Sequence, residues 1–115
     1  MQDQNNLQVY QEAYQFGLRV YNINYPEFEK FGLRDQLRRA AISISLNLAE
    51  GCGRQSDKDF LRFLYISYGS IKESETLLDF SRDLNYISQA EYLVLRDQLG
   101  NIAKKLNNLI KSVRN

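Results

Sequence analysis

Apolar residues recur at intervals of three and four positions along almost the whole chain, and this spacing constrains the fold more than any other feature. Side chains three or four residues apart lie on one face of an α-helix. The chain contains one proline and six glycines, so few positions would interrupt a helix. The spacing predicts four helices, over about residues 5–24, 33–50, 57–85 and 89–113.

The predicted helix ends carry residues with known backbone preferences. Pro26 ends the first helix because proline disfavours helix at the preceding residue. Gly51 and Gly53 follow the second helix, where glycine adopts a left-handed cap without steric cost. Ser56 and Ser88 precede the third and fourth helices as N-cap residues, whose hydroxyls accept hydrogen bonds from backbone amides.

Short connections make successive helices antiparallel. The predicted fold is therefore all-α, an antiparallel up-down-up-down four-helix bundle formed as one domain over residues 1–115. The longest connection carries three aromatic residues that we expect to pack onto the end of the bundle: Tyr25, Phe28 and Phe31. In the first helix, we expect the core stripe to contain Leu7, Tyr10, Tyr14, Gly17, Leu18 and Tyr21.

The composition argues against most enzymes and against a membrane protein. There is no histidine, which removes the commonest general base and the commonest metal ligand. Cys52 has no histidine partner, although Arg54 and the start of the third helix could lower its pKa. No apolar run is long enough to span a bilayer, and the polar N-terminus lacks the layout of a secretion signal. We predict a cytoplasmic protein that is not an enzyme and uses no cofactor or metal.

The second helix has two apolar stripes, although a helix on the surface of a monomer needs one. The core stripe contains Leu37, Ala40, Ala41, Ile44 and Leu48. The surplus residues lie on other sides of the second and third helices: Ile42, Leu46, Ala49, Leu61, Tyr65 and Tyr68. Phe16 and Val20 of the first helix add to this surplus. We predict a homo-oligomer with these residues at its interfaces; the alternative is apolar residues scattered over the surface.

A ladder of polar residues separates the two stripes of the second helix. It contains Arg39, Ser43, Asn47 and Glu50. We interpret the ladder as a structural hydrogen-bond network that joins the second and third helices, with Arg39 paired to Glu73 or Glu75. The alternative is a binding or catalytic groove that uses the guanidinium and the carboxylate.

Basic residues form two groups, although the net charge is only +1, from 15 basic and 14 acidic residues. One group is expected around the second connection: Arg34, Arg38, Arg54, Lys58 and Arg62. The other is a stripe on the fourth helix: Lys104, Lys105, Lys111 and Arg114. Either group could contact phosphates, and the alternative is an ordinary solvated surface. The candidate nucleic-acid contacts are Arg38, Arg54, Lys58 and Arg62.

Residues 31–78 resemble the signature of the bacterial four-helix bundle protein family whose first members are encoded in intervening sequences of 23S rRNA genes. The matching residues are Phe31-Gly32-Leu33, Gln36, Arg38-Arg39, Ser43, Asn47, Ala49-Glu50-Gly51, Phe60, Phe63, Gly69-Ser70 and Glu73. A related branch comprises the accessory proteins of diversity-generating retroelements. The resemblance implies a pentameric ring with a basic surface that binds RNA or DNA and a protein partner such as a reverse transcriptase.

Together these observations predict a non-enzymatic homo-oligomer, with a pentamer favoured, that serves as a nucleic-acid-associated accessory module. The alternative is a protein–protein interaction scaffold that binds no nucleic acid. An enzyme that uses the polar ladder is a third hypothesis, which an open concave pocket at the ladder would favour.

Overall fold

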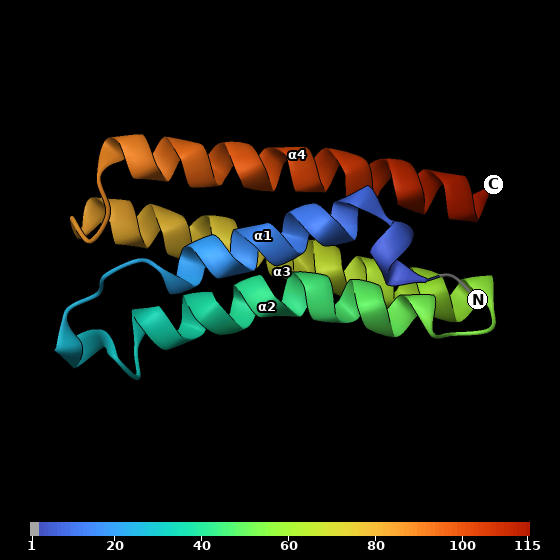
Figure 1. Ribbon diagram of the computed structural model, residues 1–115, viewed down its shortest axis with the longest axis horizontal. Coiled ribbons are helices and arrows are strands. Elements are labelled where there is room, and N and C mark those ends of the chain that lie inside the picture. The colour runs from blue at the N-terminus through green and yellow to red at the C-terminus, as the bar shows by residue number, and fades with distance from the viewer. Residues whose placement is uncertain (1–2) are drawn as a thin grey trace.

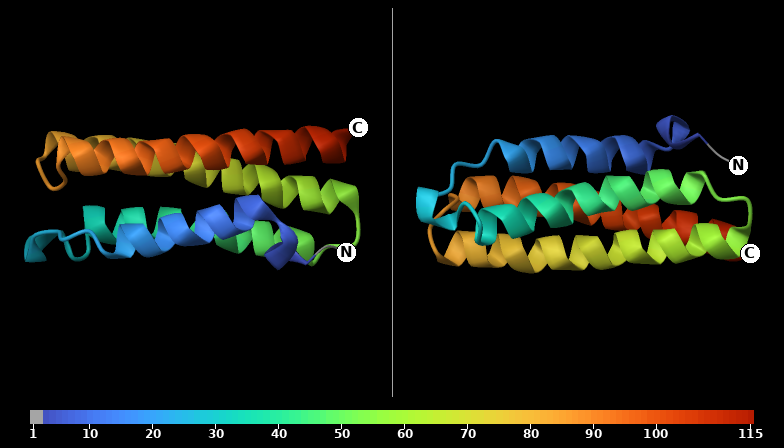
Figure 2. Two further views of the ribbon diagram at one scale, coloured as in Figure 1. Left: turned by 45° about the horizontal axis from the view of Figure 1, so that its top comes forward. Right: turned by 90° about the horizontal axis from the view of Figure 1, so that it is seen from below.

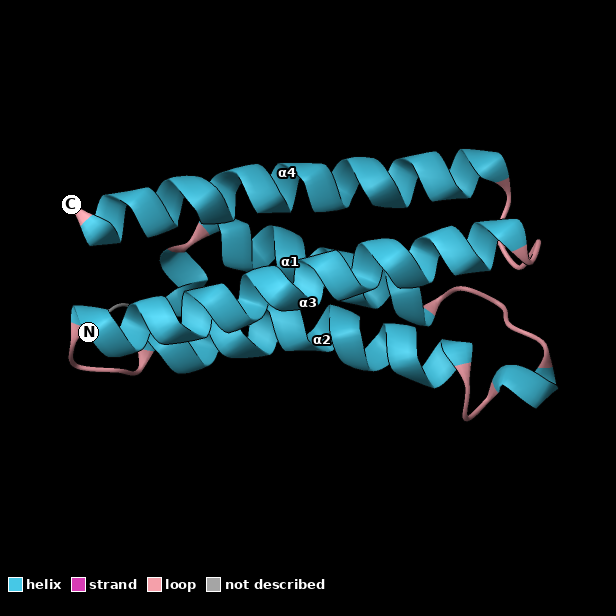
Figure 3. Ribbon diagram, turned by 180° about the vertical axis from the view of Figure 1, so that it is seen from behind, coloured by secondary structure: helices cyan, strands magenta, loops and turns pink. Residues whose placement is uncertain are grey.

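The computed structural model describes residues 3–115. Its four α-helices are α1 (Gln8–Tyr21), α2 (Leu33–Cys52), α3 (Asp57–Asp83) and α4 (Gln89–Arg114). They lie side by side in an elongated molecule of 43 × 24 × 20 Å (Figure 1). Two short 3₁₀ turns, η1 (Gln4–Asn6) and η2 (Glu27–Glu29), precede α1 and α2. No strand occurs within the described residues (Figure 3).

Successive helices run antiparallel, as Figure 2 shows from two further sides. The Ser70 hydroxyl of α3 donates to Ser43 Oγ of α2 at 2.7 Å, and the Ser67 hydroxyl donates to the Ile44 carbonyl at 2.8 Å. Residue numbers therefore rise along one helix as they fall along the other. The same order relates α4 to its two neighbours, through the pairs Glu75–Arg96, Asp79–Tyr92, Arg19–Glu91 and Glu12–Lys105. The predicted antiparallel four-helix bundle is confirmed.

The core face of α1 differs from the expected one. Phe16 and Val20, which we expected to add to the surplus outside the core, are fully buried. Val9 and Ala13 complete this buried face at steps of three and four residues. The expected core residues Tyr14, Leu18 and Tyr21 are instead exposed by 44–50%. Because α1 is apolar on two sides, its own periodicity does not decide which side meets the other helices.

Helices α3 and α4 begin with the predicted serine caps. The Ser56 hydroxyl accepts from the Asp59 amide at 3.1 Å, and the Ser88 hydroxyl accepts from the Glu91 amide at 3.1 Å. These bonds satisfy amides that have no partner inside the first turn of a helix. The two caps therefore fix where each helix begins after its short connection.

The predicted glycine cap of α2 is wrong. The helix continues through Gly51 to Cys52, and Gly53 has a right-handed φ of −81°. The left-handed residue is instead Asn85, which follows α3 with a φ of 64°. The Tyr86 amide then reaches back to the Ser81 carbonyl at 2.8 Å, closing α3 with the bond pattern of a Schellman motif. Asparagine is among the few residues besides glycine that adopt this conformation readily.

The connection between α1 and α2 is attached to the bundle end by hydroxyl groups. Tyr25 Oη lies 2.6 Å from Ser81 Oγ, and the Tyr86 hydroxyl donates to Glu29 Oε2 at 2.8 Å. Phe28 meets the Tyr86 ring edge-on, with centroids 6.4 Å apart, but stays 79% exposed. Phe31 is 86% exposed, so the expectation that it packs onto the bundle end is wrong. The tyrosine hydroxyls form hydrogen bonds at the bundle end, whereas phenylalanine has no hydroxyl that could do so.

Candidate nucleic-acid interface

Three of the four predicted phosphate contacts lie together at the connection between α2 and α3. Arg54 follows the end of α2, and Lys58 and Arg62 lie four residues apart in the first turns of α3. All three are exposed. We call Arg54, Lys58 and Arg62 the connection cluster.

Phe63 orders the two arginines of this cluster. The Arg54 and Arg62 guanidinium carbons lie 4.7 and 4.6 Å from the centroid of the Phe63 ring, within the range of a cation–π interaction. Arg54 also contacts Glu50 at 3.2 Å, and Arg62 contacts Asp59 at 3.9 Å. Ion pairs this exposed contribute about 0–1 kcal/mol, so a polyanion can replace the carboxylates at little cost.

Arg38 does not belong to the connection cluster. It lies near the start of α2, about 24 Å from Arg54 along the helix at about 1.5 Å per residue. Its guanidinium stacks on the Tyr21 ring at 4.5 Å and donates to the Tyr21 carbonyl at 3.2 Å. Arg34 lies at the same end and donates to the Lys30 carbonyl at 3.4 Å. The prediction that these two arginines gather around the second connection is wrong, because the full length of α2 separates them from it.

Part of the polar ladder joins α2 to α3. The Asn47 side chain donates to the Ser43 carbonyl at 2.8 Å and to the Ser43 hydroxyl at 2.9 Å. Ser43 Oγ also accepts from Ser70 across the helix pair. The other two ladder residues face solvent. Arg39 forms an ion pair with Asp35 at 3.8 Å, and Glu50 forms one with Arg54, in each case four residues away along the chain. The predicted pairing of Arg39 with Glu73 or Glu75 is therefore wrong.

An open pocket of about 500 Å³ lies beside the start of the ladder. Its lining includes Arg39, Ser43 and Glu73. Ser43 Oγ accepts two hydrogen bonds, from Asn47 and Ser70, and within residues 3–115 no basic group bonds to it. A serine nucleophile needs an adjacent general base to activate it. Of the four ladder residues, only Arg39 and Ser43 line the pocket. It therefore does not bring the Arg39 guanidinium and the Glu50 carboxylate together, as the enzyme hypothesis requires.

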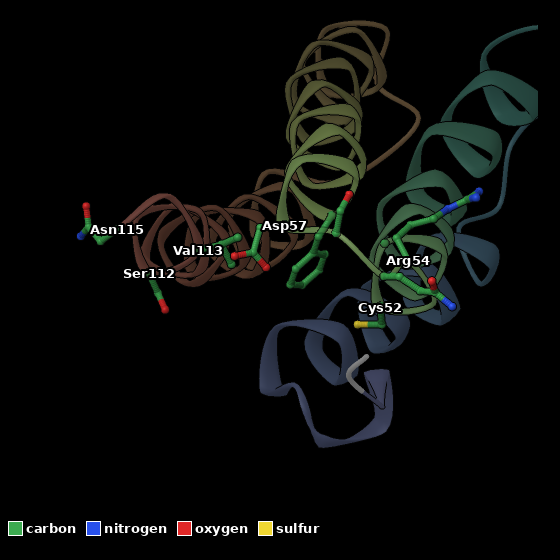
Figure 4. A pocket seen from close by; sticks show the side chains of 10 residues that line it. Cys52, Arg54, Asp57, Ser112, Val113 and Asn115 are labelled. Atoms are coloured by element: carbon green, nitrogen blue, oxygen red, sulfur yellow. The ribbon is translucent and has the colours of Figure 1, made fainter.

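A second pocket, of about 380 Å³, lies at the bundle end where α2, α3 and α4 meet. Figure 4 shows the Cys52 sulfur pointing toward α4, whose Val113 lines the same pocket, although Cys52 itself is only 2% exposed. Burial raises the pKa of the Cys52 thiol, and the negative charge of Asp3 raises it further. The expectation that Arg54 and the start of α3 lower this pKa is therefore wrong, and the thiol is a poor nucleophile at neutral pH.

The six predicted interface residues lie on two sides of the bundle. On α2, Ile42 and Leu46 are exposed and Ala49 is half-buried. Ile42, Leu46 and Ala49 follow Arg38 at steps of four, four and three residues. Because Arg38 contacts Tyr21 of α1, these residues lie on or next to the side of α2 that faces α1. On α3, Tyr65 is exposed, whereas Leu61 and Tyr68 are half-buried against the core. These three share the side that faces α4.

Helix α1 carries an exposed apolar surface that the sequence-based predictions did not include. Tyr14, Leu18 and Tyr21 are exposed at steps of four and three residues, and Tyr21 meets Arg38 of α2. Since α1 and α2 are antiparallel, this stripe and the stripe of Ile42 and Leu46 run side by side from that contact. We call these five residues the α1–α2 apolar face. The sequence shows the helical spacing of Tyr14, Leu18 and Tyr21, but spacing alone does not tell an exposed stripe from a core stripe.

The described helices contain no segment with both the length and the apolar character needed to cross a membrane. A search of curated proteins found no relative. The fold is similar to a solved structure from Bacteroides thetaiotaomicron VPI-5482, described as a protein with unknown function from the S23 ribosomal protein family. The TM-score is 0.82 at 27% sequence identity, over 90% of this chain and 98% of that chain. Residues 5–108 match the family described as 23S rRNA-intervening sequence protein. The chain therefore belongs to the 23S rRNA-intervening sequence protein family.

Proposed function

We propose that this protein is a non-enzymatic, homo-oligomeric accessory module that associates with nucleic acid. The observation that carries the proposal is the connection cluster of Arg54, Lys58 and Arg62. Three exposed cations on adjoining turns can contact neighbouring phosphates, and the Phe63 ring holds two of them in place. Such contacts position a polyanion without reading its sequence.

The test is a comparison of two triple variants with the same change in charge. Arg54→Gln/Lys58→Gln/Arg62→Gln removes the connection cluster, and Lys30→Gln/Arg38→Gln/Arg39→Gln removes three cations at the opposite end of α2. Binding of labelled RNA and DNA is measured by fluorescence anisotropy over a range of salt concentrations. Removing three phosphate contacts should weaken binding and reduce the slope of log K against log salt by about 2 for a single strand.

The control triple variant should bind nearly as tightly as the wild type. Equal losses in the two variants would mean that net charge alone governs binding, and the connection cluster would then have no special role. Failure of the wild-type protein to bind RNA or DNA at low salt would refute nucleic-acid association altogether.

Self-association is the second part of the proposal, with a pentamer as the favoured assembly. We place one interface on the α1–α2 apolar face, because five large apolar side chains are exposed there on adjoining helices. Contiguous exposed apolar surface of this kind is typical of protein–protein contacts. Leu46→Lys should lower the mass measured by light scattering, whereas Leu93→Lys on α4, at similar exposure (59% and 56%), should not. A monomeric wild type at micromolar concentration would refute this part.

The alternative function is a protein–protein scaffold that binds no nucleic acid. The strong exposure of Phe28 and Phe31 on the α1–α2 connection favours it, because such rings can insert into a partner's pocket. A pull-down that recovers a protein partner, a reverse transcriptase for example, after nuclease treatment would support this alternative. Loss of that partner in Phe28→Ser/Phe31→Ser would locate the contact.

A further inference from the structure

Most of the cations without an ion pair lie toward one end of the bundle. Among the described residues, the basic side chains that form no ion pair are Arg34, Arg38, Lys58, Lys104, Lys111 and Arg114. Arg34 and Arg38 turn back onto backbone carbonyls of their own end of the molecule. The other four are exposed and lie in the first turn of α3 and the C-terminal half of α4. No carboxylate therefore neutralises these four cations directly.

On α4, the free cations form a single row. Arg96, Gly100, Lys104, Asn107, Lys111 and Arg114 follow one another at steps of four and three residues, which places them on one side of the helix. Arg96 pairs with Glu75 of α3 at 3.6 Å, so this side borders α3. Lys105, which we expected in the same stripe, points the other way and pairs with Glu12 of α1 at 2.7 Å.

A matching row runs along α3. Lys58, Arg62, Tyr65 and Lys72 follow one another at helical spacing, and Lys72 pairs with the same Glu75 at 3.3 Å. Glu75 thus ties the two rows together at one end. Because α3 and α4 are antiparallel, the rows continue side by side from that point, and Lys58 lies at the level of the end of α4. The row on α3 is about 21 Å long and the row on α4 about 27 Å, at about 1.5 Å per residue.

Few carboxylates oppose these rows. Asp57 at the start of α3 lines a pocket together with Val113 of α4, and Asp59 contacts Arg62 at 3.9 Å. Glu75 is shared between two cations, and Asp97 is exposed on α4. Since the whole chain carries a net charge of only +1, the concentration of cations here leaves the rest of the surface relatively acidic. The side of the bundle that carries the two rows is therefore modestly more positive than the rest of the surface.

We propose that the face between α3 and α4 binds a single-stranded polynucleotide along the helix axes. The inference rests on the proposed function and deepens it, because it extends the connection cluster into a track and specifies an unpaired strand. We define the α3–α4 track by Lys58, Arg62, Tyr65, Lys72, Arg96, Lys104, Lys111 and Arg114. At about 3.4 Å per nucleotide along a stacked strand, the row on α4 matches about eight nucleotides.

An unpaired strand fits the track better than a duplex does. Tyr65 is half-exposed and lies between Arg62 and Lys72 in the row, where its ring can stack on a base whose phosphates contact the cations. The proposal thus assigns Tyr65 to the nucleic-acid site and not to the predicted oligomer interface. Aromatic rings among cations are the usual means by which proteins hold single strands without sequence preference. Two helices lying side by side also offer no single projecting helix that could enter the major groove of a duplex.

The experiment uses variants of α4, so that the connection cluster stays intact. Lys104→Gln/Lys111→Gln removes two cations of the track, and Lys30→Gln/Arg39→Gln removes the same charge elsewhere. Tyr65→Ala removes the stacking ring, and Phe31→Ala removes a more exposed ring at the opposite end of the bundle. Each protein is titrated against labelled single-stranded RNA, single-stranded DNA and duplex DNA, after circular dichroism has shown that it remains folded.

We expect the α4 double variant to bind single strands more weakly than its control, with the salt slope reduced by about 1.4. Tyr65→Ala should weaken single-strand binding at least about fivefold and leave duplex binding unchanged, while Phe31→Ala should have no effect. One outcome would refute the track and leave the proposed function standing. In that outcome the wild type binds, the connection-cluster variant does not, and the α4 double variant binds as tightly as its control. Tighter binding of duplex than of single strands would refute the assignment to an unpaired strand.

Discussion

Replacing Ser74 with alanine should stabilise the protein. Ser74 lies on the core side of α3 with no exposed surface, and its hydroxyl has no hydrogen-bond partner within residues 3–115. The other buried serines of α3 differ in this respect. The Ser67 hydroxyl donates to the Ile44 carbonyl of α2, and the Ser70 hydroxyl donates to Ser43. Ser74 thus carries the cost of burying a hydroxyl without the benefit of a bond.

The magnitude follows from three effects. Leaving a buried hydroxyl unpaired costs about 1–3 kcal/mol, and alanine is about 0.5 kcal/mol more favourable than serine in a helix. Loss of the oxygen leaves a void of roughly 15 Å³, which costs about 0.4 kcal/mol. Ser74→Ala should therefore raise the free energy of unfolding by about 1–3 kcal/mol. For 115 residues, an unfolding entropy of about 0.24 kcal/mol/K converts this to a rise in Tm of about 4–13 °C.

The assay is urea unfolding followed by circular dichroism, at one fixed protomer concentration because self-association couples to stability. Ser67→Ala is the matched control, and it should lower the free energy of unfolding by about 1 kcal/mol through loss of its interhelical bond. An unchanged or lower stability in Ser74→Ala would show that the hydroxyl is satisfied, and the argument from its orphaned oxygen would fail. A stabilised Ser67→Ala would show that helix propensity alone explains both variants.

Three further predictions concern other parts of the bundle. The pKa of Glu29 lies below its ordinary 4.5, because its carboxylate accepts from a backbone amide and a tyrosine hydroxyl. The stabilisation from ionised Glu29 should therefore be complete above pH 4.5 and be lost as the pH falls through the lowered pKa. Glu29→Gln should make the free energy of unfolding fall less steeply at acid pH, and an unchanged pH dependence would contradict this. The Cys52 thiol, whose pKa burial raises, should react with a thiol reagent only as fast as the protein opens, and rapid reaction in the folded state would exclude that burial. Gly51→Ala should destabilise by about 1–3 kcal/mol, because an added Cβ would lie 2.9 Å from the Phe60 ring. An added Cβ at Gly69 would meet nothing within 4 Å apart from its chain neighbours and its own helix backbone. Gly69→Ala should therefore stabilise by about 0.5–1 kcal/mol, and thermal melts that reversed this order would refute the packing argument.

The antiparallel bundle could be predicted because its determinants are local or nearly so. Helical spacing of apolar residues, the serines at 56 and 88 and the single proline each act within a few residues. Short connections then leave antiparallel packing as the simplest way to bury the apolar stripes. The helix ends were less predictable, since Gly51 continues α2 and Asn85 rather than glycine takes the left-handed position after α3.

The candidate site was only partly predictable, because side-chain direction depends on which face each helix turns inward. Arg38 and Arg54 belong to the same stretch of sequence, yet α2 carries them to opposite ends of the bundle. Lys104 and Lys105 are neighbours in sequence, yet one is free beside α3 and the other is paired with α1. A count of charges treats such residues alike. In the helix, successive side chains are rotated by about 100° and therefore face different neighbours.

By itself, the sequence determined that the chain forms four helices and where most of them begin, because the periodicity and caps that specify a helix are encoded within one or two turns. Only the tertiary structure decided which side of α1 forms the core, with Phe16 inside and Tyr14 outside. It also decided which cations stay unpaired. Both outcomes depend on contacts between helices distant in sequence. Burial against a neighbouring helix, and ion pairs with it, determine which side of each helix faces inward.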